Sequence, residues 1–348
     1  MKRIAIELLV LLASLSVRAA AYQPSSALQL DGKTVIELTS SLKEYEDPPK
    51  VIGKVSSLGG GTSTILVNRW ASEFAALHPE TEFNIQSGGG TEGLAKLMAG
   101  QVDLVPMNRS LTSADITRFK EKFGYEPAQI IVAQDAVGVY VNKDNPVTGL
   151  TLAQLQAIYS RASNIGPQPE FWGDVGVTGP LANERLDRVS LSKVHGTHRY
   201  FQDEILHGGE YRLSVHFEPV SSSLVQAAGA NPMAIGFASV MFGTDRTRFV
   251  PLQAKDGSWL LPTYENTVSG RYPLVRPMRI VFNRKPDGAM NSVARELLRF
   301  AVSKRGQRVM ALACGYPLTL EQQQEALRII GEAPPQRAAS HRRGAGDH

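Results

Sequence analysis

The sequence contains a single cysteine, Cys314, among 348 residues, and this excludes several kinds of protein. No intramolecular disulfide can form, and no group of thiolates is available to hold zinc or an iron–sulfur centre. After the N-terminal segment, no stretch reaches the about 18 uninterrupted apolar residues expected of a membrane-spanning helix. The sequence also lacks a basic stripe interleaved with aromatic residues, and its formal net charge of +4 is small for this length. We therefore do not expect a nucleic-acid-binding protein.

The N-terminus has the pattern of a secretory signal peptide. A basic start precedes an apolar run from Ile4 to Val17, and Ala19 and Ala21 follow in an A-x-A arrangement. Cleavage is expected before Tyr22, so that residues 1–21 are removed and the mature protein is periplasmic or secreted. The alternative is an uncleaved membrane anchor, but the apolar run is too short for a comfortable span of about 20 residues.

The segments next to the two ends are expected to lie outside the folded core. Residues 22–50 are mixed and polar, which predicts a loosely attached leader. Residues 331–348 are rich in Pro, Gly, Ala and basic residues and lack apolar periodicity, which predicts a disordered tail. Between them, short apolar strands alternate with helical patterns. Such alternation is typical of an α/β fold built on largely parallel sheets.

Two long apolar segments suggest that the chain leaves one domain and later returns to it. Residues 130–146 and 272–286 each read as a long strand that ends in Asn, a basic residue and a turn with Pro. We therefore expect a first lobe of residues 51–144 plus 272–330 and a second lobe of residues 145–271. The stretch "SVARELLRFAVSKRGQRVMALACGYPL" is expected to form one long amphipathic helix that packs on the first lobe.

Four turns rich in Gly, Ser or Thr follow predicted strands and precede predicted helices. They span residues 59–64, 87–91, 106–112 and 193–200. A helix N-terminus presents unpaired N–H groups and a partial positive charge. Glycine allows the backbone to approach a ligand closely, and hydroxyls add directed donors. Because ligands of open α/β sheets bind beyond the carboxyl ends of the strands, the four turns together predict an oxyanion site, although one such turn alone is common in any α/β protein.

Catalytic and metal sites are less well supported by the sequence. The stretch "GGGTEGLAK" lacks the Gly-Lys-Ser/Thr ending of a nucleotide phosphate loop, and no G-x-S-x-G elbow of a hydrolase occurs. His195 and His198 could share a helical face and bind a divalent metal, but no third ligand follows at a diagnostic spacing. Surface histidines at the start of a helix are the favoured interpretation. We expect no metal, no cofactor and no catalytic residues.

In their joint order and spacing, the segments resemble the substrate-binding component of bacterial phosphate ABC importers, the PstS-like group of the periplasmic binding protein type II superfamily. Matching stretches include "GGGTSTILVNRWASEF", "SGGGTEGLAKLMAGQVDLVPMNRSLT", "HGTHRYFQDEIL" and "EPVSSSLVQAAGANPMAIGFASV". The resemblance covers about residues 55–320. It implies two lobes, each a mainly parallel sheet flanked by helices, joined by two crossover strands, with the ligand in the cleft between them. It also implies hinge closure and an inner-membrane permease as partner.

Carried over by position, the resemblance implies nine ligand-binding residues, distributed over the four turns. They are Thr62 and Ser63 in the first turn, Gly90 and Thr91 in the second, Asn108 and Arg109 in the third, and His195, Gly196 and Thr197 in the fourth. Hydroxyl and backbone N–H groups are expected to donate to oxyanion oxygens, and Arg109 to supply positive charge.

Three positions depart from the pattern of the family. Relatives typically carry an arginine where Leu191 stands, and a serine where His195 stands. Some carry an aspartate, which accepts the proton of hydrogen phosphate, where Asn108 stands. Lys193, His195 and Arg199 are the candidates for the missing positive charge, and a contact from His195 would strengthen binding at lower pH. The departures leave open whether the ligand is phosphate or a related oxyanion.

The sequence therefore predicts an exported, monomeric solute-binding protein that captures phosphate or a related oxyanion in an interlobe cleft for an ABC importer. The alternative is a secreted or periplasmic interaction or sensory module with a degenerate cleft, favoured by the altered fourth turn and the basic tail. An extracytoplasmic metalloenzyme that uses His195 and His198 ranks last.

Overall fold

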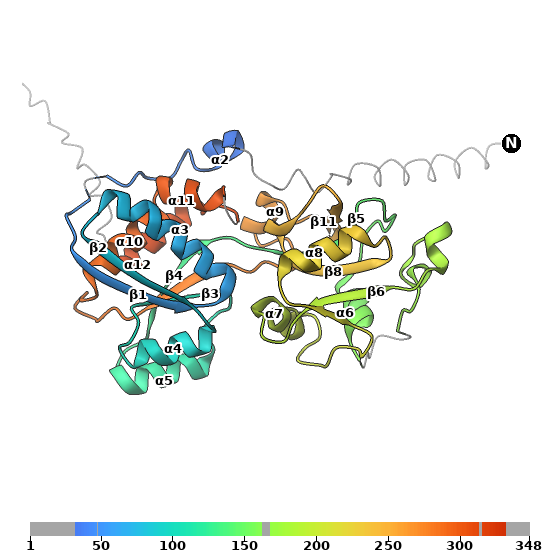
Figure 1. The fold of residues 1–348 in the computed structure, drawn as a ribbon, viewed down its shortest axis with the longest axis horizontal. Helices are drawn as coiled ribbons and strands as arrows, with labels where there is room; N and C mark the ends of the chain where they lie inside the picture. The colour runs from blue at the N-terminus through green and yellow to red at the C-terminus, as the bar shows by residue number, and fades with distance from the viewer. Residues whose placement is uncertain (1–31, 47, 162–167, 313–314, 332–348) are drawn as a thin grey trace, which may run out of the picture.

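The computed structural model of the protein describes residues 32–46, 48–161, 168–312 and 315–331 (Figure 1). The predicted signal peptide, Cys314 and the predicted tail beyond Gly331 lie outside these ranges, so what was expected of them stays a prediction. Within the described ranges, no helix is both long and apolar enough to cross a membrane.

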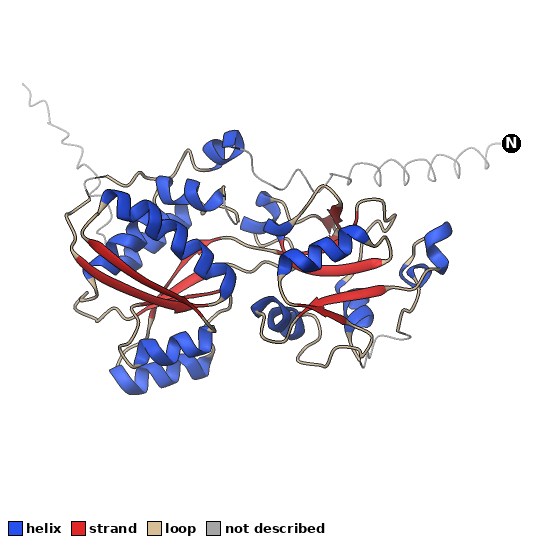
Figure 2. Ribbon diagram, in the orientation of Figure 1, coloured by secondary structure: helices blue, strands red, loops and turns tan. Residues whose placement is uncertain are grey.

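Two five-stranded sheets organise the chain, and Figures 1 and 2 show them side by side. The first sheet, which defines the first lobe, consists of β1 (Gly53–Gly59), β2 (Thr81–Ser87), β3 (Leu104–Met107), β4 (Ala128–Ala133) and β12 (Met278–Phe282). Their order across the sheet is β2-β1-β3-β12-β4. β1 runs parallel to β2 and β3, whereas β12 runs antiparallel to β3 and β4.

The second sheet defines the second lobe and repeats this plan. It consists of β5 (Val137–Asn142), β6 (Asp187–Leu191), β7 (His216–Glu218), β8 (Ala234–Ser239) and β9 (Thr247–Phe249), in the order β7-β6-β8-β5-β9. β6 is parallel to β7 and β8, and β5 is antiparallel to β8 and β9. A small hairpin of β10 (Leu252–Gln253) and β11 (Trp259–Leu260) completes the strands. The predicted two-lobe α/β fold is thus confirmed.

Helices cover both faces of the first sheet (Figure 1). One face carries α3 (Gly61–Leu77), α10 (Ser292–Val302), α11 (Lys304–Ala311) and α12 (Leu320–Ile330), and the other α4 (Gly90–Met98) and α5 (Ser113–Phe123). The first face buries Trp70, Phe74 and Phe300, and the second buries Leu94 and Phe119. Because helices pack on both faces of the sheet, the carboxyl ends of its strands are held in fixed positions.

The second lobe has its own core. Its helices are α6 (Leu152–Tyr159), α7 (Gly196–Glu204), α8 (Ser221–Ala230), α9 (Tyr264–Val268) and the short turns η3 (Trp172–Val175), η4 (Pro180–Asn183) and η5 (Val240–Phe242). Phe201 of α7 stacks on Phe237 of β8 with ring centroids 3.6 Å apart, and Tyr159 packs edge-on to both rings. This aromatic cluster fixes α7 against the sheet.

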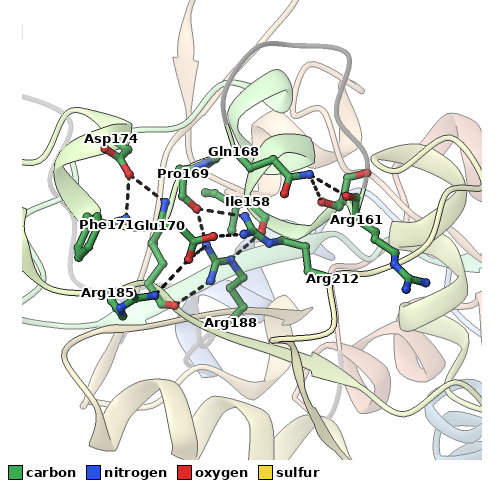
Figure 3. A network of polar contacts seen from close by, with 12 residues as sticks. Ile158, Arg161, Gln168, Pro169, Glu170, Phe171, Asp174, Arg185, Arg188 and Arg212 are labelled. Atoms are coloured by element: carbon green, nitrogen blue, oxygen red, sulfur yellow. Dashed lines mark hydrogen bonds and ion pairs between the residues drawn. The ribbon is translucent and has the colours of Figure 1, made fainter.

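A network of arginines ties the segments around β6 together (Figure 3). The buried Arg188 donates to the carbonyl oxygens of Ile158, at 2.7 Å, and Pro169. Glu170 is paired with Arg188 and Arg212. The N–H groups of Arg188 are occupied by these acceptors, so its charge is not available to a ligand.

The two segments that connect the lobes lie side by side. The first segment passes from β4 to β5 through Asp135, and the second leads into β12. An antiparallel bridge between Ala136 of the first segment and Val275 of the second joins them. The backbone N–H of Arg276 donates to Asp135 O at 2.7 Å. Residues 130–146, which the sequence predicted as one long strand, are therefore two strands in different sheets. The second sheet accordingly begins with β5, ahead of the predicted lobe boundary at residue 144.

The predicted long helix that begins at Ser292 is in fact broken at Ser303. This residue has an extended backbone, with φ −68° and ψ 162°, between α10 and α11. Its hydroxyl accepts from Gly306 N at 3.2 Å, which caps the new helix. A serine inside an amphipathic pattern therefore marks a corner that periodicity alone does not reveal.

Part of the predicted loose leader packs on the first lobe. Here α2 (Gly32–Leu38) buries Val35, and Leu42 is buried beyond it. Lys304 N donates to Lys43 O at 2.7 Å, and Arg308 Nε donates to Thr39 Oγ1 at 3.1 Å. The described part of the leader, from Gly32 onward, is thus held against α11.

Candidate functional site

Three of the four predicted turns meet at one edge of the first sheet. They follow the carboxyl ends of the parallel strands β1, β2 and β3, where α3, α4 and α5 begin. Gly60 N donates to Pro106 O at 3.1 Å, which joins the first turn to the third. Gly88 N donates to Gly59 O at 2.8 Å, which joins the second turn to the first. Segments far apart in sequence thus form one continuous polar edge.

Four glycines in and next to these turns differ in what surrounds them. A Cβ on Gly59 would lie 2.1 Å from Pro106 O, and one on Gly93 would lie 2.4 Å from Leu58 O, so these two are required by close backbone packing. A Cβ on Gly60 or Gly89 would meet nothing within 4 Å. These two positions face open space, so packing does not explain their lack of a side chain.

Gly60 and Gly89 are also the N-cap residues of α3 and α4. Neither helix has a side-chain cap, so the first N–H groups of both are left without the usual side-chain acceptor. Gly90 and Thr91 form the first turn of α4, and Thr91 is exposed. The structure does not describe the side chain of Thr62. Two uncapped helix N-termini at one edge favour an anion by both hydrogen bonding and helix dipole.

Ser63 and Asn108 are bonded to each other at the same edge. The buried hydroxyl of Ser63 donates to the Asn108 amide oxygen Oδ1, which joins the first turn of α3 to the turn after β3. With Oδ1 engaged, Asn108 has its Nδ2 amide hydrogens to donate, and no partner for Nδ2 is found among the described residues. The pair therefore presents a donor, not a carboxylate, to a ligand.

Arg109 is held by a carboxylate. Its Nη1 donates to Asp115 Oδ2 at 2.7 Å, and Arg118 binds the other oxygen of Asp115 at 3.0 Å. Asp115 also completes a capping box with Thr112 at the start of α5. Burial opposes ionisation, but the hydrogen bonds from Thr112 and Arg109 outweigh it and lower the pKa of Asp115 to about 2. Asp115 therefore offsets part of the charge predicted for Arg109, and it divides its own charge between Arg109 and Arg118.

The fourth turn lies in the second lobe, between β6 and α7, and His195 caps the helix there. Its Nδ1 accepts from Thr197 N at 3.2 Å, while Gly196 is exposed. Burial, together with the nearby Arg276 and His198, lowers the pKa of His195 to about 4. Because an imidazole with this pKa is neutral at pH 7, His195 does not replace the missing positive charge. Lys193 and Arg199, the other candidates, are exposed.

The two histidines that could share a metal differ in exposure, because His195 is half-buried and His198 is buried. His198 is buried, and its Nδ1 lies 2.8 Å from Leu191 O, so the expectation that both histidines lie on the surface was wrong. In the parts of the chain that the structure describes, no group of three or more His, Cys, Asp or Glu residues could hold a metal ion.

Sequence reasoning missed Arg276, which lies beside the fourth turn. Arg276 precedes β12 on the second connecting segment and is only 3% exposed. Its Nη1 donates to Thr197 Oγ1 at 2.8 Å and its Nη2 to Asp135 Oδ2 at 2.7 Å. The only signal in the sequence is a basic residue inside the apolar stretch "YPLVRPM". Leu191, where relatives typically carry an arginine, is a fully buried apolar residue.

The structure therefore brings the first three turns into direct contact, and connects the fourth to the segments between the lobes. Among the described residues, no hydrogen bond or ion pair joins the fourth turn to the other three. Hydrogen-bond donors are therefore present in both lobes. The first three turns supply those of the first lobe, and the fourth turn supplies those of the second.

Comparison with known sequences gives consistent matches. Residues 46–305 match the sequence model of the PBP superfamily domain. The phosphate-binding protein PstS of Pseudomonas aeruginosa is 32% identical over 324 residues, which cover 92% of this chain and 98% of that protein. PstS of Staphylococcus epidermidis is 26% identical over 260 residues, covering 73% of this chain and 76% of that protein.

Solved structures with the same fold include two phosphate receptors. An ABC-type phosphate transport receptor from Vibrio cholerae has a TM-score of 0.63 and 22% identity, covering 76% of this chain and 100% of that chain. A substrate-binding protein of a putative phosphate ABC transporter from Clostridium perfringens, with bound phosphate, has a TM-score of 0.60 and 22% identity over the same shares of the two chains. At these identities the likeness shows the fold.

Proposed function

This chain belongs to the PBP superfamily, and from this premise we propose that it is an exported binding protein that captures phosphate between its two lobes for an ABC importer. Its relative in Pseudomonas aeruginosa, aligned over nearly the full length of both chains, is named as a phosphate-binding protein. The proposal needs a site in this chain with the chemistry to hold a small oxyanion.

The observation that carries the proposal is the pair of uncapped helix N-termini at the edge of the first sheet. The N-cap residues Gly60 and Gly89 carry no side chain, have no side-chain cap and face open space. A tetrahedral oxyanion supplies the acceptors that these N–H groups lack. Asn108, which is bonded to Ser63 in the first turn of α3, adds the N–H groups of its Nδ2 to the same edge.

The second lobe supplies the other half of the proposed site. Gly196 and Thr197 begin α7 at the carboxyl end of β6. An anion held by the first lobe would be enclosed when these residues approach by bending at the two connecting segments. The backbone N–H of Thr197 reaches the ligand only if His195 releases it, so we expect closure to include a rotation of the His195 side chain.

Binding, not catalysis, is the function that the proposed contacts favour. The Ser63 hydroxyl bonds to an amide, which is not a general base, and Thr197 bonds to a guanidinium, which is always protonated. The relatives named above are phosphate-binding proteins and a transport receptor. Export by the N-terminal signal, a monomeric state and a permease partner complete the proposal.

Calorimetry with the ligand-free protein tests this function. Ligand is removed by unfolding and refolding, and phosphate, arsenate and sulfate are then titrated separately. We expect phosphate to bind with a dissociation constant in the micromolar range or below, and the melting temperature to rise with phosphate concentration. A protein that refolds fully and binds none of the three anions would contradict the proposal and favour the degenerate interaction or sensory module.

A further inference from the structure

A buried chain of polar groups connects the segments between the lobes to the fourth turn. Ser239 Oγ donates to Asp135 Oδ1 at 2.6 Å, and Arg276 Nη2 donates to Asp135 Oδ2 at 2.7 Å. Arg276 Nη1 in turn donates to Thr197 Oγ1 at 2.8 Å. None of these four residues is more than 3% exposed. The chain begins at the end of β8 and ends in the first turn of α7.

This arrangement fixes the role of the Thr197 hydroxyl. A hydroxyl has one proton to donate and two lone pairs, whereas a guanidinium can only donate. Because Arg276 occupies a lone pair of Thr197 Oγ1, the proton of that hydroxyl must point to a different acceptor. Among the described residues, no acceptor for this proton is found. The hydroxyl is therefore a donor with its acceptor missing, at the start of a helix that faces the proposed ligand.

The guanidinium itself is held in one orientation. Asp135 binds it through the side chain and also accepts from the Arg276 backbone N–H, and the ring of Tyr200 lies 5.6 Å from its central carbon. The ion pair has little net charge, so its effect on a ligand is directional and short-ranged. A donor that is itself hydrogen-bonded by a cation is polarised and becomes a stronger donor.

We propose that Arg276 is a positioning residue of the anion site, which orients and polarises the Thr197 hydroxyl so that its proton is donated to the bound oxyanion. Asp135 and Ser239 hold Arg276 in place. The inference rests on the proposed function, and it identifies the residue that acts at the fourth turn in a chain with leucine at position 191. It also connects the ligand to the segments between the lobes. The Thr197 hydroxyl that would contact the anion is bonded to Arg276, which lies on the second connecting segment.

A double-mutant cycle with inorganic phosphate tests the inference. Thr197→Val removes the hydroxyl with little change in shape, and we expect phosphate affinity to fall roughly 10- to 100-fold. Arg276→Lys keeps the charge but loses the planar fork that serves Asp135 and Thr197 together, and we expect a fall of roughly 5- to 20-fold. In the Thr197→Val background, the same Arg276→Lys change should alter affinity by less than about twofold, because its target is already absent.

Tyr200→Phe is the matched control for a purely structural role. The Tyr200 hydroxyl donates to Val275 O at 3.0 Å and is a second link between α7 and the same connecting segment. If Arg276 only holds α7 in place, losing this link should also weaken binding. We expect Tyr200→Phe to lower the melting temperature and to leave phosphate affinity within about twofold of wild type.

Failure of the inference and failure of the function are distinguishable. Wild-type protein that refolds and binds no phosphate contradicts the function. The inference alone is overturned if wild-type protein binds phosphate and Arg276→Lys does not weaken binding. It is also overturned if Arg276→Lys weakens binding equally with and without the Thr197 hydroxyl. If Arg276→Lys does not fold, the double variant Asp135→Asn with Arg276→Gln takes its place in the cycle. This variant removes both charges and keeps a buried hydrogen bond. Its effect on phosphate affinity should likewise depend on whether the Thr197 hydroxyl is present.

Discussion

Ser63 and Asn108 are joined by a hydrogen bond in which the serine hydroxyl donates to the amide oxygen. The two residues lie in different turns of the first lobe, and their contact decides what Asn108 offers a ligand. With the oxygen engaged, the amide nitrogen remains as a donor. A carboxylate at this position would be an acceptor and would carry charge, so Asn108 affects both affinity and selectivity.

Asn108→Asp should make the site more selective against sulfate. Sulfate carries no proton at pH 7 and would be repelled by the new carboxylate, whereas hydrogen phosphate can donate its proton to it. We expect sulfate affinity to fall at least about tenfold more than phosphate affinity, a difference of roughly 1.4 kcal/mol. Calorimetry of both anions against wild type and variant measures this. Equal loss for the two anions would show that Asn108 does not face the ligand.

Gly59→Ala should mainly lower stability, whereas Gly89→Ala should mainly lower phosphate affinity. A Cβ at position 59 would collide with Pro106 O, so we expect a loss of about 1–3 kcal/mol in the free energy of unfolding. A Cβ at position 89 meets nothing, and φ of −107° suits alanine, so the loss should stay below about 1 kcal/mol. Phosphate affinity should fall about tenfold in Gly89→Ala, because the methyl group enters the space proposed for the ligand.

Urea unfolding and calorimetry on the same two variants check this prediction. Gly100→Ala, at a positive φ of 71° outside the four turns, is a control that should lower stability without changing the affinity of the folded protein. If Gly89→Ala binds phosphate as wild type does, the open space at this turn is not part of the ligand site.

Helix starts that depend on local interactions are the elements that sequence patterns predict best. Thr112 and Asp115 lie three residues apart and form the capping box that starts α5. The contacts that sequence reasoning missed are long-range. Arg276 binds Thr197 and Asp135, and no spacing rule connects a basic residue of one crossover to residues far upstream. The corner at Ser303 is local, but an amphipathic pattern continues through it.

The change of sheet at Asp135 was missed for a related reason. β4 and β5 are both apolar and are separated by only a few residues, so hydropathy shows one segment. What divides them is the pairing of β5 with β8 and β9, which depends on strands much later in the chain. The predicted boundary at residue 144 therefore falls after β5, although β5 pairs within the second sheet, and the boundary at residue 271 stays a prediction.

The pKa of His195 predicts a dependence of stability on pH. Burial lowers this pKa from 6.5 to about 4 in the folded state, so the unfolded chain binds more protons between these values. The free energy of unfolding should therefore decrease as pH falls from 6.5 towards 4, with a contribution of about 1–3 kcal/mol from this residue. The contribution is fully present above pH 6.5, where His195 is neutral in both states.

His195→Asn isolates this effect, because asparagine also caps a helix but does not titrate. Urea unfolding at pH 7 and pH 4.5 should show a smaller loss of stability in the variant than in wild type. The buried His78 and His198 also have lowered pKa values, and their contributions are present in both proteins and cancel in the comparison. Equal pH dependence in the two proteins would mean that the pKa of His195 is not lowered in the folded state.

Arg109 and Asp115 give a pair of opposite predictions for binding. Arg109→Ala removes a positive charge next to Asn108, and we expect phosphate affinity to fall roughly 3- to 10-fold. Asp115→Asn removes the carboxylate that neutralises Arg109 but keeps an oxygen to accept from Thr112 N, so affinity should rise or stay equal. Both changes should reduce stability, because each breaks an ion pair in which the pKa of Asp115 is about 2.

The two variants together decide whether the charge of Arg109 reaches the ligand. An electrostatic effect has opposite signs in the two proteins and weakens with added salt, because screening reduces the interaction of exposed charges. A local disturbance of the turn before α5 would instead lower affinity in both variants and would not depend on salt. Phosphate titrations at low and high ionic strength distinguish these cases, and equal losses in both variants would remove Arg109 from the proposed site.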